Sequence, residues 1–218
     1  LFDDKTGEFW FLEVNTRLQV EHPVTEEVTD MDLVYEQLRI ARGEELGYEQ
    51  SDISWNGHSI EARLYAEDPD NDFLPETGTL IAFEEDYEAE ARWDSGVESG
   101  SIVGTSFDPM LAKVISYGAT RTDAATKLAR ALEAAHIGGL TTNRDFLVAT
   151  LKTQEFLDGD TTTDFIDRVR PPRALVLSDK QIKHVTAIAA LWIQELNRLH
   201  DDVLGHLPSG WTNGRTPK

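Results

Sequence analysis

Residues 13–23 read EVNTRLQVEHP, and this run of alternating polar and apolar residues decides the fold of the sequence around it. Successive side chains of an extended strand point to opposite faces, so every second residue shares a face. The run therefore predicts a strand with one apolar face against a core and one polar face. The polar side chains are Glu13, Asn15, Arg17, Gln19 and Glu21.

The polar row has two interpretations. It can be the solvated face of a half-buried strand, a common arrangement in antiparallel sheets. Asn and Glu, however, are poor strand formers. The row also combines oxygen atoms that can bind a hard metal ion, a positively charged side chain that can bind an anion, and a carboxylate that can act as a base. Eight residue steps span about 26 Å in a straight strand. The groups must therefore bend inward to share one small substrate, or follow a long one.

Composition narrows the classes of protein to which the chain can belong. It has 218 residues with 40 acidic and 20 basic side chains, a formal net charge of −20 and no cysteine. Disulfide frameworks, thiolate zinc sites and cysteine nucleophiles are excluded, and the composition fits a reducing, cytoplasmic location. The negative field opposes a nucleic-acid backbone, and no apolar run approaches the roughly 20 residues of a membrane span. We expect neither nucleic acid nor membrane as a partner.

Outward from the run, the sequence predicts an α+β fold. Apolar and polar residues alternate across residues 59–67, where Arg63 falls on the polar face. Turn residues separate the strand segments, which favours antiparallel pairing. The expected strands lie at residues 8–12, 59–67, 79–83, 91–93 and 111–117, and the expected amphipathic helices begin at residue 29 or 30 and end before Gly43, and span 122–135, 143–154 and 179–204.

Further motifs follow the run in a fixed order. They are EQLRIA at residues 36–41, GHSIEAR at 57–63, AEDP at 66–69, FLP at 73–75, TG at 77–78 and FDPMLAK at 107–113. Together with residues 13–26, they closely resemble the biotin carboxylase component of biotin-dependent carboxylases, of the acetyl-, propionyl- or methylcrotonyl-CoA carboxylase α-subunit type. The resemblance covers about residues 1 to 170. Dense matching in order is far more specific than a single short motif.

The resemblance implies three parts. Residues 1–45 resemble the C-terminal end of an ATP-grasp domain, and residues 46–170 resemble the biotin carboxylase C-terminal domain, an antiparallel sheet with flanking helices. Residues 171–218 are expected to form a linker and a helical extension towards a downstream domain, with the boundary at two adjacent prolines. Because Leu1 stands within a patterned segment, we expect the chain to be a C-terminal fragment of this component.

The implied activity is ATP-dependent carboxylation of biotin by bicarbonate, catalysed by a ligase that forms a C–N bond. ATP phosphorylates bicarbonate to carboxyphosphate, which breaks down to carbon dioxide and phosphate, and the phosphate takes a proton from the biotin ureido nitrogen. The implied cofactors are ATP, Mg²⁺ or Mn²⁺, bicarbonate, and biotin as a carrier-bound substrate. The implied partners are a biotin carboxyl carrier domain or protein, a carboxyltransferase subunit, and a second copy of the chain that pairs through the C-terminal domain.

The resemblance also assigns acidic and amide residues of the run to metal binding and proton transfer. Glu13 matches a carboxylate ligand of the metal ions that bridge the ATP phosphates, with Asn15 close by. Such ions are typically held by few carboxylates plus phosphate oxygens. Glu21 matches the general base that deprotonates bicarbonate, a role that needs a carboxylate within hydrogen-bonding reach of the proton.

Two arginines complete the implied site. Arg17 matches the residue that orients bicarbonate and carboxyphosphate, a task suited to a planar guanidinium. Gln19 and the backbone N–H of Val20 complete the bicarbonate site. Arg63 matches the residue that binds biotin and stabilises negative charge on its ureido oxygen; without the resemblance it would be interpreted as a surface salt-bridge residue. The implied catalytic residues are therefore Glu21, Arg17 and Arg63.

Departures from the family leave other interpretations open. Most of the ATP site, a second metal carboxylate and a bicarbonate-binding lysine are expected upstream of Leu1, and neither Met31 nor Met110 precedes the lysine of a biotin-attachment motif. One alternative is another ATP-grasp ligase, such as a carbamoyl-phosphate synthetase-like enzyme. The other is a non-catalytic dimerisation module, because the region near Arg92 resembles the family's dimer contact. The sequence does not identify the acyl-CoA substrate.

Overall fold

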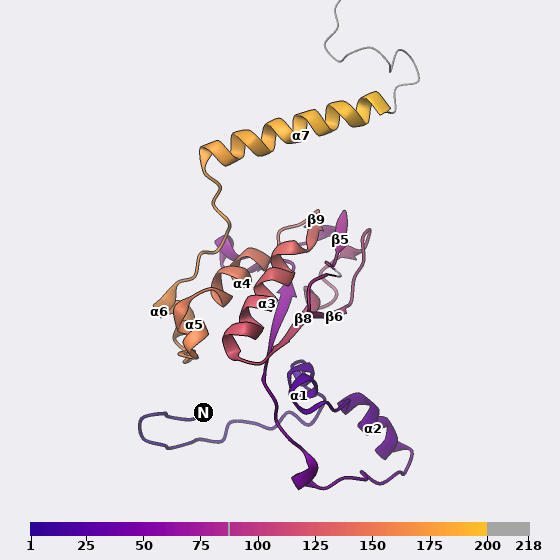
Figure 1. The fold of residues 1–218 in the computed structure, drawn as a ribbon, viewed down its shortest axis with the longest axis vertical. Helices are drawn as coiled ribbons and strands as arrows, with labels where there is room; N and C mark the ends of the chain where they lie inside the picture. Colours follow the sequence, from indigo (N-terminus) through magenta and orange to yellow (C-terminus); the bar gives the residue numbers. More distant parts are fainter. Residues whose placement is uncertain (87, 200–218) are drawn as a thin grey trace, which may run out of the picture. The chain divides into compact units, whose positions relative to one another are not determined.

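A computed structural model describes residues 1–86 and 88–199 (Figure 1). The chain divides into two compact units, residues 1–174 and residues 175–218. Within the second unit the described part contains one long helix, α7 (Asp179–Leu199). The helix was predicted to continue to Leu204, but residues 200–204 lie outside the described residues.

The central sheet of the first unit has three antiparallel strands. It consists of β1 (His58–Tyr65), β8 (Met110–Gly118) and β6 (Arg92–Ser95) in the order β1-β8-β6. In the ladder between β1 and β8, Arg63 stands opposite Lys113, and in the ladder between β6 and β8, Asp94 stands opposite the same lysine. Every strand pair in the described part of the chain is antiparallel. These findings confirm the predicted α+β class with an antiparallel sheet.

One face of this sheet packs against α3 (Arg121–Ala134), as Figure 1 shows. The apolar side chains of alternate strand residues, including Ala62 and Val114, pack against Leu128 and Leu132 in one buried cluster. Because side chains alternate across a strand, the residues between them point to the opposite face. Glu61 and Arg63 of β1 and Lys113 of β8 therefore face away from α3, whereas Ser116 of β8 faces it and donates to the carbonyl oxygen of Ala124.

Leu128→Ala is expected to destabilise the first unit strongly. The Leu128 side chain is fully buried at the centre of the cluster under α3. Removing it leaves a cavity, which costs about 2–5 kcal/mol of unfolding free energy. Urea unfolding of the purified chain measures this loss. The matched control is Leu74→Ala, which shortens an exposed leucine and should change the free energy by no more than about 0.5 kcal/mol; equal losses for the two variants would contradict the packing.

The remaining strands and helices of the first unit are short. Two small helices, α4 and α5, pack beside α3, and three two-stranded pairs border the central sheet. Their bounds are α1 (His22–Thr29), α2 (Leu33–Ala41), α4 (Arg144–Leu151), α5 (Gln154–Asp158), α6 (Phe165–Val169), η1 (Gln50–Asp52), η2 (Pro69–Asn71), β2 (Glu67–Asp68) with β3 (Leu74–Pro75), β4 (Gly78–Thr79) with β7 (Ile102–Val103), and β5 (Ala82–Glu84) with β9 (His136–Gly138).

The structure differs from the prediction in the N-terminal segment. The expected strand at residues 8–12, continuing into the polar run, is reduced to a single bridge between Phe2 and Phe9. The side chains of Phe11, Leu12 and Val14 are exposed. A strand is stabilised by ladder hydrogen bonds to a neighbouring strand. Among the described residues, residues 8–12 have this bridge and the backbone hydrogen bonds of a short hairpin, between Leu1 and Trp10 and between Asp3 and Glu8, which end before the polar run. The prediction of a regular strand here is wrong for the chain as described.

Two helix boundaries also differ from the prediction. Helix α1 directly follows the polar run and was not predicted; its Pro23 lies in the first turn, where a missing backbone N–H is tolerated. The single helix expected at residues 143–154 is divided into α4 and α5, because the hydroxyl of Thr153 caps a new helix by accepting from the N–H of Phe156. Helix α2 follows its N-cap Asp32, close to the predicted start.

Helix α7 has several exposed apolar side chains, including Val185, Ile188, Leu191 and Trp192. Charged residues interrupt its sequence. No described helix has the length and hydropathy that crossing a lipid bilayer requires.

Candidate active site

The polar run and the sheet meet in an ion pair. Glu21 is the residue immediately before α1, and Arg63 lies on the polar face of β1. Arg63 Nη2 donates to Glu21 Oε2 at 2.8 Å. The two side chains are 42% and 55% exposed, respectively, so both are accessible to a small molecule. The expected approach of an arginine from the sheet to the carboxylates of the run is thus present for Glu21.

Asn143 fixes the backbone that carries Arg63. Its buried side chain accepts from the N–H of Tyr65 at 2.9 Å and donates to the carbonyl oxygen of Arg63 at 3.1 Å. The ladder with β8 shifts register between Leu64 and Tyr65, so ordinary strand pairing is interrupted at this point. The side-chain amide of Asn143 therefore provides hydrogen-bond partners for backbone groups of β1 at this irregularity.

Charged side chains form a layer between α1 and the sheet. The layer follows from register, because Glu61, Arg63 and the residues opposite them share the face away from α3. We call it the charged layer. Its members are Glu21 and Glu26 from the α1 segment, Glu61 and Arg63 from β1, Lys113 from β8, and Arg92 and Asp94 from β6.

Lys113 connects the layer to the polar run. Its Nζ donates to the carbonyl oxygen of Val20 at 3.3 Å and lies 3.1 Å from Asp94 Oδ2. The lysine side chain is only 13% exposed. The backbone just before Glu21 is therefore held to the middle strand of the sheet by a buried cation.

Arg92 connects α1 to the far edge of the sheet. Its guanidinium donates to Asp94 Oδ1 at 2.9 Å and to Glu26 Oε2 at 2.8 Å. The other oxygen of Glu26 accepts from the N–H of Leu33 at the start of α2. Hydrogen bonds to Asp94 and then to Glu26 raise the pKa of Arg92 above its ordinary value. One guanidinium thus links β6 to α1 and, through Glu26, to α2.

The two carboxylates beside Lys113 have opposite pKa shifts. Burial is the largest influence on Asp94 and would raise its pKa, but hydrogen bonds and charge from Arg92 and Lys113 outweigh burial and hold the pKa below its ordinary value. Burial also dominates at Glu61, where it raises the pKa against the opposing charges of Lys113 and Arg63. Position within the layer therefore decides how readily each carboxylate is protonated.

Asp94 is expected to make folding stability sensitive to acid. Its pKa lies below the ordinary value in the folded chain, so the folded state binds fewer protons than the unfolded chain once the pH falls below about 5. Its stabilising contribution is complete above that pH and is lost as the pH falls through the folded pKa. Urea unfolding should therefore show a larger deficit for Asp94→Asn at about pH 7 than at about pH 3. A deficit that stays constant with pH would contradict this assignment.

A groove of about 690 Å³ adjoins the ion pair. Its polar lining includes Arg17, Gln19 and Glu21, and its apolar lining comes mainly from α2 and the loop after it. The apolar lining residues include Leu18, Leu33, Ile40, Leu46 and Tyr48. Three of the predicted site residues therefore lie along one concave surface, next to the guanidinium of Arg63.

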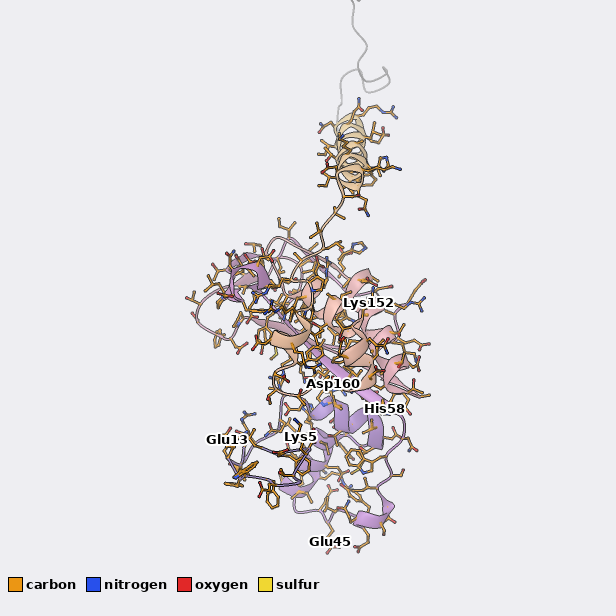
Figure 2. The ribbon with its side chains drawn as sticks, turned by 90° about the vertical axis from the view of Figure 1, so that its left-hand side faces the viewer. Lys5, Glu13, Glu45, His58, Lys152 and Asp160 are labelled. Atoms are coloured by element: carbon orange, nitrogen blue, oxygen red, sulfur yellow. The ribbon has the colours of Figure 1, made fainter. Side chains whose placement is uncertain are left out.

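The predicted metal ligands lie outside this groove. Glu13 and Asn15 are exposed, and neither side chain lines it; Figure 2 labels Glu13 on the N-terminal segment. The backbone carbonyl of Asn15, by contrast, accepts from the amide of Gln19 at 3.2 Å. No cluster of three or more potential ligands from His, Cys, Asp and Glu occurs in the described residues. One carboxylate and one amide fit a Mg²⁺ ion only if phosphate oxygens and water complete its shell.

Comparison with known families gives a match across both parts of the first unit. The biotin carboxylase C-terminal domain family matches residues 61–168, and the ATP-binding domain family of the carbamoyl-phosphate synthase L chain matches residues 1–49. The chain belongs to the biotin carboxylase family. The first match ends at residue 49 and the second begins at residue 61, within β1, so the Glu21–Arg63 ion pair joins the region of the first match to that of the second.

Similar proteins support membership in the biotin carboxylase family. Biotin carboxylase 2 of Bacillus subtilis (strain 168) is 49% identical over 163 residues, which cover 75% of this chain and 36% of that protein. The mitochondrial propionyl-CoA carboxylase alpha chain of Homo sapiens is 41% identical over 86% of this chain and 26% of its own length. The chain thus spans about a third or less of these relatives.

Solved structures agree with the fold. The biotin carboxylase domain dimer of Hydrogenobacter thermophilus 2-oxoglutarate carboxylase, solved with MgADP, ADP and bicarbonate, has a TM-score of 0.74 and 38% identity. The match covers 77% of this chain and 37% of that one.

The sequence did not point to three residues that organise the site. They are Glu61 and Asn143, which contact Arg63, and Lys113, which contacts the polar run. Two of them lay within recognised motifs but carried no assigned role. The alternation of β1 placed Glu61 on the same face as Arg63, so that residue could have been found from sequence. The contacts of Lys113 and Asn143 depend on pairing between distant segments.

Proposed function

We propose that the chain is the C-terminal part of an ATP-dependent biotin carboxylase, a ligase that forms a C–N bond between bicarbonate-derived carbon dioxide and biotin. The observation that carries the proposal is the 2.8 Å contact between Glu21 and Arg63. It brings a candidate base and a candidate oxyanion-stabilising group together at the edge of a groove. Family membership supplies the reaction.

Glu21 is proposed to act as the general base. Its exposed carboxylate takes the proton from bicarbonate, and the resulting carbonate oxygen attacks the γ-phosphorus of ATP. The bond between the γ-phosphorus and the bridging oxygen breaks, so that carboxyphosphate forms and ADP leaves. A base positioned in this way typically contributes a rate factor of about 10²–10⁴.

Arg17, Gln19 and the backbone N–H of Val20 are proposed to bind bicarbonate. The side chains of Arg17 and Gln19 line the same groove as Glu21. A guanidinium can donate two parallel hydrogen bonds to a planar anion, and an amide N–H can donate a third. Lys113 supports this site indirectly, because it holds the carbonyl of Val20 to the sheet.

Glu13 and Asn15 are proposed as ligands for Mg²⁺ or Mn²⁺. Their carboxylate and amide oxygens are the hard donors that these ions prefer. Once bound, the ion would offset negative charge on the ATP phosphates. The adjacent residues would continue to bind bicarbonate and transfer its proton, and the other phosphate-binding groups are proposed to come from a longer polypeptide, since relatives extend well beyond the matched region.

Arg63 is proposed to bind carrier-linked biotin. Carboxyphosphate breaks down to carbon dioxide and phosphate, and the phosphate removes the proton from the ureido nitrogen, which then attacks carbon dioxide. Negative charge develops on the ureido oxygen during this step. A guanidinium aimed at that oxygen stabilises the charge electrostatically.

The partners are proposed from family membership. Biotin arrives on a carboxyl carrier domain or protein, and a carboxyltransferase subunit consumes carboxybiotin. We further infer a homodimer formed through the C-terminal domain and a cytoplasmic location. Sedimentation velocity of the purified chain tests the dimer; a monomer across the micromolar range would argue against it.

The decisive experiment uses the full-length polypeptide that contains this chain. With ATP, Mg²⁺ and labelled bicarbonate, it should transfer label to free biotin, and biotin should stimulate ADP release. A carbamoyl-phosphate synthetase-like enzyme would instead release ADP without any response to biotin. Absence of both bicarbonate-dependent ADP release and biotin labelling would refute the proposed function.

A further inference from the structure

Glu61 is an unusual residue within the charged layer. Its side chain is only 4% exposed, and neither carboxylate oxygen has a hydrogen-bond partner in the described structure. Burying a carboxylate without hydrogen bonds is costly, and such groups are rare unless they serve a purpose. This raises the question of what Glu61 does.

The position of Glu61 relative to Arg63 suggests an answer. The two residues share one face of β1, and Glu61 Oε1 lies 3.8 Å from Arg63 Nε. On its other side the same guanidinium donates through Nη2 to Glu21. Arg63 therefore stands between two carboxylates, the exposed one of Glu21 and the buried one of Glu61.

We propose that Glu61 is a positioning residue that retains the Arg63 guanidinium in the site when Glu21 becomes protonated. This inference rests on the proposed function of Glu21 and Arg63. It adds a residue that touches neither substrate and acts through Arg63. Glu61 approaches the guanidinium on its Nε side, so it leaves the Nη groups to Glu21 and to the ureido oxygen.

The need for a second carboxylate follows from the proton balance. When bicarbonate gives its proton to Glu21, carbonate forms and the Glu21 carboxylate becomes a neutral acid. Protonation removes the negative charge of Glu21 and with it the Coulomb attraction to the guanidinium, so the Glu21–Arg63 pair weakens at that moment. Arg63 is 42% exposed and would otherwise be free to turn into water.

Charges around Glu61 allow it to serve as this anchor. Burial is the largest influence on Glu61 and raises its pKa, and Glu21 acts in the same direction. Lys113 and Arg63 favour the charged form, as does His22 at the start of α1. Protonation of Glu21 removes the opposing charge, which makes the anionic form of Glu61 more favourable. The attraction between Glu61 and Arg63 therefore increases when the attraction to Glu21 decreases.

A merely structural role for Glu61 makes different predictions. If it only held the sheet to α1, replacing it would lower stability and affect every activity of the site alike. A positioning role predicts a selective loss at the biotin step, because carboxyphosphate formation depends on Glu21 and Arg17 rather than on Arg63. The two roles can therefore be separated by experiment.

The first experiment measures the order of the Arg63 side chain in the 218-residue chain by ¹⁵N NMR. The Nε–Hε signal is assigned by its loss in Arg63→Lys. In Glu21→Gln, which mimics the protonated base, the Arg63 signal should keep its positive heteronuclear NOE. In the double variant that combines Glu21→Gln with Glu61→Gln, the signal should lose this positive NOE. Loss of order in Glu21→Gln alone would overturn the proposal, and that variant leaves Glu61 untouched.

The second experiment measures two rates in the full-length polypeptide. Glu61→Gln should lower kcat for biotin carboxylation about 10- to 100-fold relative to bicarbonate-dependent ATP cleavage without biotin, as expected for a displaced catalytic group. Glu61→Asp keeps the charge and should recover part of the loss. The matched control is Glu85→Gln, because burial also raises the pKa of Glu85 but Glu85 lies outside the charged layer.

The outcomes distinguish this inference from the proposed function. Equal losses of both rates in Glu61→Gln, or no loss in either, would overturn the positioning role while leaving the function intact. If unmodified polypeptide shows no bicarbonate-dependent ATP cleavage, the proposed function itself fails. The NMR experiment needs no turnover and reports on Arg63 in either case.

Discussion

In the full-length polypeptide, Glu21→Gln is expected to slow bicarbonate-dependent ATP cleavage about 10²- to 10⁴-fold. Glutamine keeps the shape of the side chain and its hydrogen bond from Arg63, but it cannot accept a proton from bicarbonate. The loss should therefore appear in kcat, with a smaller change in KM for bicarbonate. ADP release with and without bicarbonate measures both constants.

The control for this variant is Glu133→Gln. Glu133 is 48% exposed and pairs with Lys152, so it resembles Glu21 in exposure and in having a cationic partner. It lies in α3, and neither it nor its partner lines the groove. Turnover of Glu133→Gln should match the unmodified enzyme. Near-normal turnover in Glu21→Gln would remove Glu21 from its proposed role as the base.

Replacement of Arg63 is expected to have the second-largest effect. Arg63→Ala should lower kcat for biotin carboxylation about 10²- to 10³-fold, because the charge on the ureido oxygen loses its electrostatic partner. ATP cleavage without biotin should fall much less. This selectivity distinguishes Arg63 from Glu21, whose loss should reduce both rates. Transfer of labelled bicarbonate to free biotin measures the first rate.

Arg63→Lys tests whether charge alone is sufficient. Lysine keeps the positive charge but loses the planar fork that can contact Glu21 and a second group at once, so most of the loss should remain. Arg168→Lys is the control, since Arg168 lies on α6 and forms a surface ion pair with Asp160. Full activity in Arg63→Lys would show that a point charge suffices and would contradict the proposed geometry.

Much of the site could be predicted because its residues lie in short local patterns. Period-two alternation placed Arg63 on the polar face of β1, and the structure confirms that position. The resemblance of residues 13–26 and the later motifs indicated the family, which the comparisons confirm. These features are encoded within about ten residues each.

What the sequence could not show depends on contacts between distant segments. Lys113 reaches Val20 across 93 positions, and no local pattern specifies that pairing. The predicted strand at residues 8–12 failed for a related reason, since strand propensity does not supply a neighbouring strand. Helix α1 was overlooked because the alternation of the polar run ends at its first residue. The individual roles of the site residues stay predictions until the variants are measured.

The hydrogen bonds between Asn143 and the backbone of β1 affect how the enzyme loses activity when it unfolds. Asn143 is 80 positions from Arg63 and leads into α4. Fraying of α4 would release the backbone beneath the guanidinium while the central sheet stayed paired. Heat or denaturant should therefore inactivate the enzyme through a local opening, before the cooperative transition that melts the core.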